Sequence, residues 1–169
     1  MSIVYLKQGE DREAFVRRAF QQFDIQQKAQ AKKVLIKPNI VSYEPYPTTT
    51  HPTTVETCLS LLQEVAREVI VADGPAPDAG DTESIIEEHV LKKSCDKFGI
   101  PLVDLSAQGI KKVRTRSFAL EISQLAFECD FIISLPVLKV HGICDLTGAL
   151  KNTLGFLSAD DKRKLHWSL

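Results

Sequence analysis

The sequence predicts an α/β fold in three layers, with a mostly parallel sheet and helices on both of its faces. Short apolar runs alternate with segments whose apolar residues recur every three or four positions, which is the order of strand–helix–strand units. The apolar runs are nearly continuous, as is typical of strands buried on both faces. The chain has 169 residues, enough for one sizeable core, so we expect a single domain over residues 1–169.

Five segments are predicted to be strands, because each is short, apolar and rich in β-branched residues. They are residues 2–7, 33–37, 68–73, 101–105 and 131–135. The stretch 110–122 holds two strand-like pieces without a helix between them. It predicts an antiparallel hairpin or an edge piece at this point.

Amphipathic helices are expected between the strands. One should begin near Thr53, because Pro52 suits a first helical turn and His51 stands at or just before the cap. Their apolar stripes include Val16 with Phe20, Val55 with Leu59, and Leu91 with Cys95.

Two further helices are predicted near the end of the sequence. Residues 145–157 suggest one capped by Asp145, with Leu150, Leu154 and Leu157 as its buried stripe. Such a helix would direct a positive dipole end toward residues 142–145, where an anion could bind. Ser158 is a plausible cap for the last helix.

Composition excludes several classes of partner. The 21 basic and 22 acidic residues nearly cancel, and the basic clusters at 111–116 and 161–164 carry no interleaved aromatic residues. We interpret both clusters as solvated surface and expect no nucleic-acid partner. No apolar stretch approaches the length of a membrane span or signal peptide, so we expect a cytoplasmic protein with no membrane partner.

The four cysteines are widely scattered and form no C-x-x-C pair. We therefore expect no iron–sulphur cluster in this chain, and reduced thiols with the exception of Cys144, which lies beside the polar residues Lys139 and His141. No Walker loop and no G-x-G-x-x-G motif occurs, so the sequence does not support nucleotide binding by a standard motif.

Polar residues end several of the predicted strands, and these are the candidate site residues. In open α/β sheets, ligands bind outside the carboxyl ends of the parallel strands, so these side chains should lie close together. Singly, each has a plain structural reading: Asp73 before glycine can make a turn, and Asp104 can cap a helix or loop. We predict Lys37, Asn39, Lys139, Lys151 and Asn152 as ligand-binding residues, and His51, His141 and Asp73 as catalytic residues.

The segments "VLIKPNIV", "TTTHPTTVE", "VIVADGP" and "IISLPVLKVHG…LTGALKNTLG" resemble the family called domain of unknown function 362, which is often described as iron–sulphur-associated. The resemblance covers nearly the whole chain in the right order. It implies an α/β fold and a bacterial or archaeal cytoplasmic setting, but no settled reaction. Some relatives carry ferredoxin-like cysteine segments, and this chain has none.

Related domains usually run further, which implies that this chain is the N-terminal part of a longer domain or a truncated member. We then expect an apolar surface near Leu165, Trp167 and Leu169, exposed or covered by another subunit. Such a protein would be a homo-oligomer or would lack a C-terminal portion. A naturally short terminal helix is the alternative.

Three functions fit these observations. The first is an enzyme or enzyme domain that binds a small anionic ligand at the carboxyl edge of the sheet. The second is a metal- or cofactor-binding module serving an iron–sulphur redox partner, with His51, Asp73 and His141 as candidate ligands of an unknown metal. The third is a structural interaction domain without catalysis.

Overall fold

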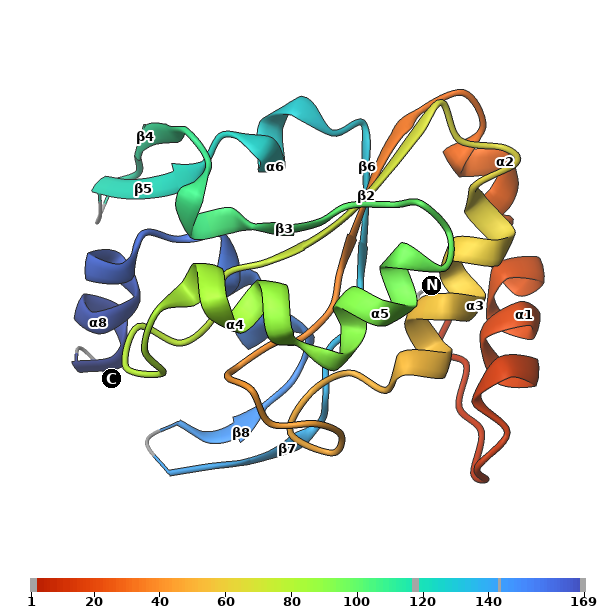
Figure 1. Cartoon of the computed structure of the whole chain (residues 1–169), viewed down its shortest axis with the longest axis horizontal. Coiled ribbons are helices and arrows are strands. Elements are labelled where there is room, and N and C mark those ends of the chain that lie inside the picture. Colours follow the sequence, from red (N-terminus) through yellow and green to blue (C-terminus); the bar gives the residue numbers. More distant parts are fainter. Residues whose placement is uncertain (1–2, 117–118, 143, 168–169) are drawn as a thin grey trace.

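The computed structural model describes residues 3–116, 119–142 and 144–167 (Figure 1). At its centre is a four-stranded sheet with the order β3-β2-β1-β6, in which every neighbouring pair is parallel. This confirms the predicted α/β class and its parallel sheet. The strands are β1 (Lys33–Lys37), β2 (Glu68–Asp73), β3 (Leu102–Asp104) and β6 (Phe131–Ser134).

Both faces of the sheet are covered, which explains why the strand sequences are continuously apolar. Val34 and Ile36 of β1 pack into the larger core, whereas Leu35 between them packs into the smaller core on the opposite face. The larger core is covered by α1 (Arg12–Gln22), α2 (Ile25–Ala29), α3 (Pro52–Leu62), α4 (Thr82–Glu88) and α5 (Val90–Asp96). The smaller core is covered by η1 (Leu105–Ala107), α6 (Leu125–Glu128) and η2 (Thr153–Phe156).

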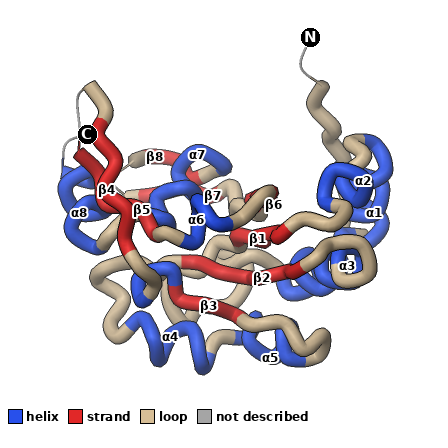
Figure 2. Tube along the Cα trace, turned by 90° about the horizontal axis from the view of Figure 1, so that it is seen from above, coloured by secondary structure: helices blue, strands red, loops and turns tan. Residues whose placement is uncertain are grey.

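Two antiparallel strand pairs flank the central sheet. The pair β4 (Ile110–Arg114) and β5 (Ala119–Ser123) confirms the hairpin predicted within residues 110–122. The second pair, β7 (Lys139–His141) and β8 (Asp145–Thr147), follows β6. Figure 2 shows β4, β5 and α8 (Ala159–Trp167) at one end of the molecule, and α1, α2 and α3 at the other.

The helix predicted to start at Asp145 is wrong. Asp145 has a positive φ of 55° and begins β8, because residues 145–147 pair with β7 instead of forming a first helical turn. The helix α7 covers only Ala149–Asn152 and passes into η2, and Leu150 is 86% exposed rather than buried. Because α7 starts only at Ala149, the dipole contribution predicted for residues 142–145 is also wrong.

The strand predicted at the N-terminus is also wrong for the residues that the structure describes. Residues 3–7 are not in a strand, and Ile3, Val4 and Leu6 are exposed. A strand needs a partner for its backbone groups, and this segment instead lies beside α1, where Tyr5 stacks on Phe15 with a ring-centroid distance of 5.3 Å.

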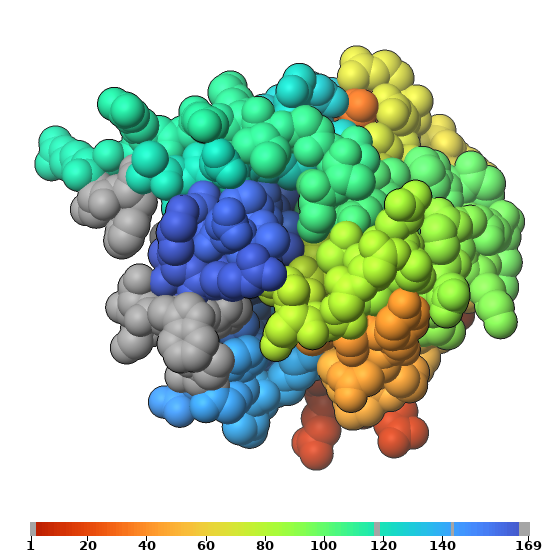
Figure 3. Space-filling model, turned by 60° about the vertical axis from the view of Figure 1, so that its left-hand side comes forward, coloured from red at the N-terminus to blue at the C-terminus, as the bar shows by residue number. Residues whose placement is uncertain are grey.

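The last helix, α8, begins as predicted: Ser158 Oγ accepts a hydrogen bond from Asp161 N at 3.3 Å. Its position corrects the interpretation of residues 161–164 as solvated surface, because Asp161 and Lys162 are buried. Figure 3 shows α8 seated between the β4–β5 region above it and the segment after β2 beside it. The side chain of Trp167, and Leu169, lie outside the described part of the chain, so the predicted apolar end surface stays a prediction.

Candidate functional site

A cavity of about 450 Å³ lies at the carboxyl end of the parallel sheet. Residues from the ends of β1 and β2, the segment after β6, the β7–β8 pair, α7, η2 and α8 border it. Seven of the eight candidate site residues belong to this border: Lys37, Asn39, Asp73, Lys139, His141, Lys151 and Asn152. Segments far apart in the sequence thus meet at the edge where parallel sheets bind ligands.

His51 is the candidate that does not border the cavity. It caps α3, since its Nδ1 accepts a hydrogen bond from Thr53 N at 3.2 Å, and its ring packs edge-on against Tyr46 with centroids 5.1 Å apart. Burial lowers the pKa of His51, and the positive charge of Arg12 lowers it further. The structure thus gives His51 a helix-capping role and no place beside the other candidates.

Lys37 and Asp73 form a buried ion pair beside the cavity. They end the adjacent strands β1 and β2, and their side chains are 1% and 2% exposed. Besides accepting from Lys37 Nζ, the Asp73 carboxylate accepts hydrogen bonds from Gly74 N at 2.8 Å and from Ile40 N at 2.6 Å. Asp73 therefore neutralises Lys37 and also holds the backbone that follows both strands.

Asn152 of α7 connects this pair to the neighbouring strand. Its Nδ2 donates to Lys37 O at 3.2 Å and to Ser134 Oγ at 3.0 Å, and its Oδ1 accepts from Lys37 Nζ at 3.4 Å. Asn152 is buried, so both ends of its amide are used within the protein. Its position indicates that it fixes Lys37 and the end of β6 in place.

Two glycines allow the surrounding backbone to approach the buried charges. A Cβ at Gly155 would meet the Asp73 carboxylate and would lie 2.6 Å from Lys37 Nζ. A Cβ at Gly74 would meet Gly155 O and would lie 2.7 Å from Lys162 Nζ. Because real Cβ atoms do not come so close to neighbouring atoms, these two positions exclude any side chain.

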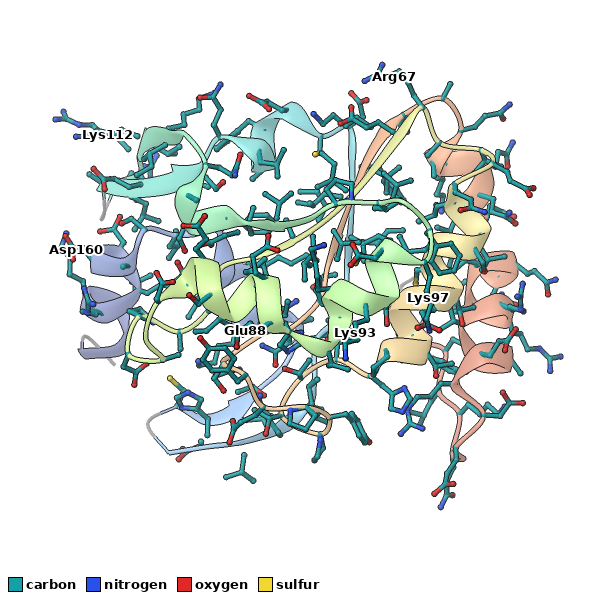
Figure 4. The ribbon with its side chains drawn as sticks, in the orientation of Figure 1. Arg67, Glu88, Lys93, Lys97, Lys112 and Asp160 are labelled. Carbon is teal, nitrogen blue, oxygen red and sulfur yellow. The ribbon has the colours of Figure 1, made fainter. Side chains whose placement is uncertain are left out.

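Lys162 of α8 is a second buried lysine on the border of the cavity. It is 4% exposed, and its Nζ donates to Gly74 O and to Pro75 O, each at 3.0 Å. Burial lowers the pKa of Lys162; the charge of Lys37 also lowers it, whereas those of Asp73 and Asp104 raise it. Figure 4 shows the neighbouring Asp160 pointing away from the molecule, so α8 carries charged side chains on both its outer and inner faces.

Asp104 ends β3 directly opposite Asp73 in the sheet register. Its Oδ1 accepts from Ser106 N at 2.7 Å, which caps η1 as the sequence suggested it could. Its Oδ2 is buried and has no hydrogen-bond partner among the residues that the structure describes.

The remaining basic candidates are more accessible. Lys139 Nζ donates to Thr48 O, and burial lowers the pKa of Lys139, as does the positive charge of Lys151. Within the described residues Lys151 makes no side-chain hydrogen bond or ion pair. His141 Nδ1 accepts from Cys144 N at 3.2 Å, which closes the turn between β7 and β8. The border of the cavity therefore includes partly exposed lysines as well as buried ones.

The described residues hold no group of three or more His, Cys, Asp or Glu side chains that could bind a metal ion. The metal site proposed from His51, Asp73 and His141 is accordingly not formed, since His51 lies apart and Asp73 is committed to Lys37. Over the same residues, no helix is long and apolar enough to cross a membrane.

Sequence reasoning did not find Lys162 or Ser134 as parts of this site. Lys162 was not singled out because it stands among the charged residues of the "DKRK" cluster, which we interpreted as solvated surface. The available signal was its spacing, because Lys162 stands three residues before Leu165 and so shares a helix face with an apolar residue.

Fold and site together define an α/β domain with a basic cavity at the carboxyl end of a parallel sheet. The chain belongs to the family described as "Domain of unknown function (DUF362)", which matches residues 34–168. It is also similar to a thylakoid-associated protein of Synechocystis sp., with 28% identity over 140 residues. That match covers 81% of this chain but only 42% of the relative, so the chain spans less than half of the relative's length.

Proposed function

We propose that this chain binds a small anionic ligand in the cavity at the carboxyl end of its sheet, as an enzyme or as a domain of one. The observation that carries the proposal is the excess of basic over acidic residues among the described residues that line the cavity. Five basic residues line it, Lys37, Lys139, Lys151, Lys162 and Arg163, against only two carboxylates, Asp73 and Asp78. Because Asp73 already neutralises Lys37, an excess of positive charge remains for a ligand.

The size and position of the cavity support the same proposal. A volume of about 450 Å³ falls within the usual range of small-molecule sites. Lys139 uses one of its three N–H donors on Thr48 O, and Lys151 uses none of its three within the part of the chain that the structure describes. We assign these two lysines to the first contact with the anion, and His141 to proton transfer on the bound ligand.

The experiment is a thermal melt of the purified protein in sodium sulfate, sodium phosphate and sodium succinate, each matched in ionic strength with sodium chloride. The wild-type Tm should rise with the concentration of at least one anion, because a ligand that binds the folded state stabilises it. In Lys139→Met and Lys151→Met the rise should shrink, and in the double variant it should be lost.

Lys93→Met is the matched control, because Lys93 is an exposed lysine on α5 and does not border the cavity (Figure 4). Its response to the anions should equal that of the wild type. A rise in Tm that survives in the double variant would remove this cavity as the anion site. A wild-type protein that responds to none of the anions beyond sodium chloride would contradict the proposal itself.

A further inference from the structure

The two buried lysines of the cavity have different partners. Lys37 Nζ pairs with the carboxylate of Asp73. Lys162 Nζ is held by two backbone carbonyls, Gly74 O and Pro75 O, and no ion pair to it is found within the described residues. Neutral acceptors hold the N–H groups of an amine as well as those of an ammonium ion, whereas a carboxylate favours the ammonium form.

The geometry around Lys162 suits an uncharged amine. A neutral primary amine has two N–H donors and one lone pair, and the two carbonyls match the two donors. The lone pair then remains without a partner on the side chain of a residue that borders the cavity. Burial acts in the same direction, because it lowers the pKa of Lys162, although the charges of Asp73 and Asp104 oppose it.

The backbone around Lys162 fixes the position of its Nζ. The backbone of the residue after β2 supplies one carbonyl, and position 74 must be glycine, since a Cβ there would meet the backbone carbonyl of Gly155 and would lie 2.7 Å from Nζ. A buried, fixed amine beside a cavity with further cations is the arrangement in which lysines act as nucleophiles.

We infer that Lys162 is a nucleophile that forms an imine with an anionic ligand carrying an aldehyde or ketone group, such as a 2-oxo acid. This rests on the proposed function, because Lys139 and Lys151 must hold the anionic group of the same ligand. The Nζ lone pair attacks the carbonyl carbon, and the carbonyl oxygen takes up a proton to give a carbinolamine. Loss of water then leaves the imine, so amine and carbonyl compound are converted to imine and water.

The probe is glyoxylate, the smallest 2-oxo acid, added to the wild-type protein with sodium cyanoborohydride, which reduces an imine to a stable carboxymethyl-lysine and leaves the free aldehyde largely intact. Peptide mass spectrometry at several times gives the labelling rate at each lysine. Lys162 should be labelled faster than the exposed Lys93, because an uncharged amine attacks a carbonyl group and an ammonium ion does not. Sulfate should slow the labelling of Lys162 and leave that of Lys93 unchanged.

Lys162→Arg replaces the primary amine by a guanidinium group, which forms no imine, and should therefore lose the label. Because the labelled position is mapped in the wild-type protein, the test holds even if this variant folds poorly. If Lys162 is labelled no faster than Lys93 while the sulfate response still depends on Lys139, the inference fails and the proposed function stands. If Lys162 is labelled no faster than Lys93 and the sulfate response does not depend on Lys139 or Lys151, both the inference and the proposed function fail.

Discussion

Two ion pairs join the central strands β1 and β2, one at each end of the sheet. At the amino end Lys33 faces Glu68 at 3.4 Å, with side chains that are 19% and 48% exposed. At the carboxyl end Lys37 faces Asp73, and both are almost fully buried. Figure 4 shows Arg67 pointing outward at the amino end. It pairs with Asp130 at 3.3 Å, and both side chains are exposed.

The residue types at the two ends are alike, so the difference comes from what covers them. The amino-end pairs remain in contact with water, where an ion pair contributes little to stability. The carboxyl-end pair is covered by η2 and held by Asn152, and removal from water makes each charge depend on its partner. The comparison indicates that packing at the carboxyl end keeps the Lys37–Asp73 ion pair away from water and in a fixed position.

The largest effect should come from removing one partner at the carboxyl end. Asp73→Ala leaves the Lys37 ammonium buried without a counter-charge and removes the acceptor of Ile40 N and Gly74 N. We expect the free energy of unfolding to fall by about 3–5 kcal/mol. Glu68→Ala, the matched change at the amino end, should cost less than about 1 kcal/mol. Urea denaturation measures both, and equal losses would show that the two ends do not differ as described.

A smaller effect is expected from Gly155→Ala. The added methyl group would lie 2.6 Å from Lys37 Nζ, so η2 must move away from the ion pair. We expect a loss of about 1–3 kcal/mol, the usual range for overpacking, together with a weaker anion response. Gly142→Ala is the control, because a Cβ at Gly142 meets nothing within 4 Å, and its effect should stay within about 0.5 kcal/mol. Urea denaturation that finds the two variants equally stable would contradict the packing at Gly155.

The smallest effect concerns pH. His89 is buried; its Nδ1 accepts from Leu91 N at 3.2 Å, its Nε2 lies 3.3 Å from Thr49 Oγ1, and burial lowers its pKa. The unfolded chain takes up a proton near pH 6.5 while the folded protein does not. Stability should therefore fall as the pH drops below about 6.5, until the lower pKa of the folded state is passed.

His89→Asn keeps a capping acceptor at this position but cannot titrate, so its stability should depend less on pH in that window. Urea denaturation of both proteins at pH 7.5 and pH 5.5 provides the measurement. A variant with the same pH dependence as the wild type would assign the acid sensitivity to other groups.

The central strands were predictable because β-branched runs buried on both faces leave a clear pattern, as in residues 33–37 and 68–73. The meeting of Lys37, Asp73 and Lys139 at one edge followed from the rule that parallel strands end on the same side. Their roles in binding or catalysis stay predictions.

Residues 145–147 were misread because their local sequence favours a helix, whereas pairing with β7 decides the structure there. The spacing of Lys162 and Leu165 indicates a shared helix face, but the contact of Lys162 with Gly74 and Pro75 joins segments far apart in the sequence, so the local sequence does not give it.

The order of strands in the sheet has a consequence for the chain as it leaves the ribosome. A nascent chain that has emerged through β3 can pack α1 to α5 against one face of the sheet, but Leu35, Ile70 and Ala72 on the other face still lack Leu125. The edge of β1 also stays unpaired until β6 follows, since Val34 pairs with Phe131. During synthesis the half-made domain thus presents an apolar face beside an open strand edge, the combination that chaperones shield and that aggregates most readily.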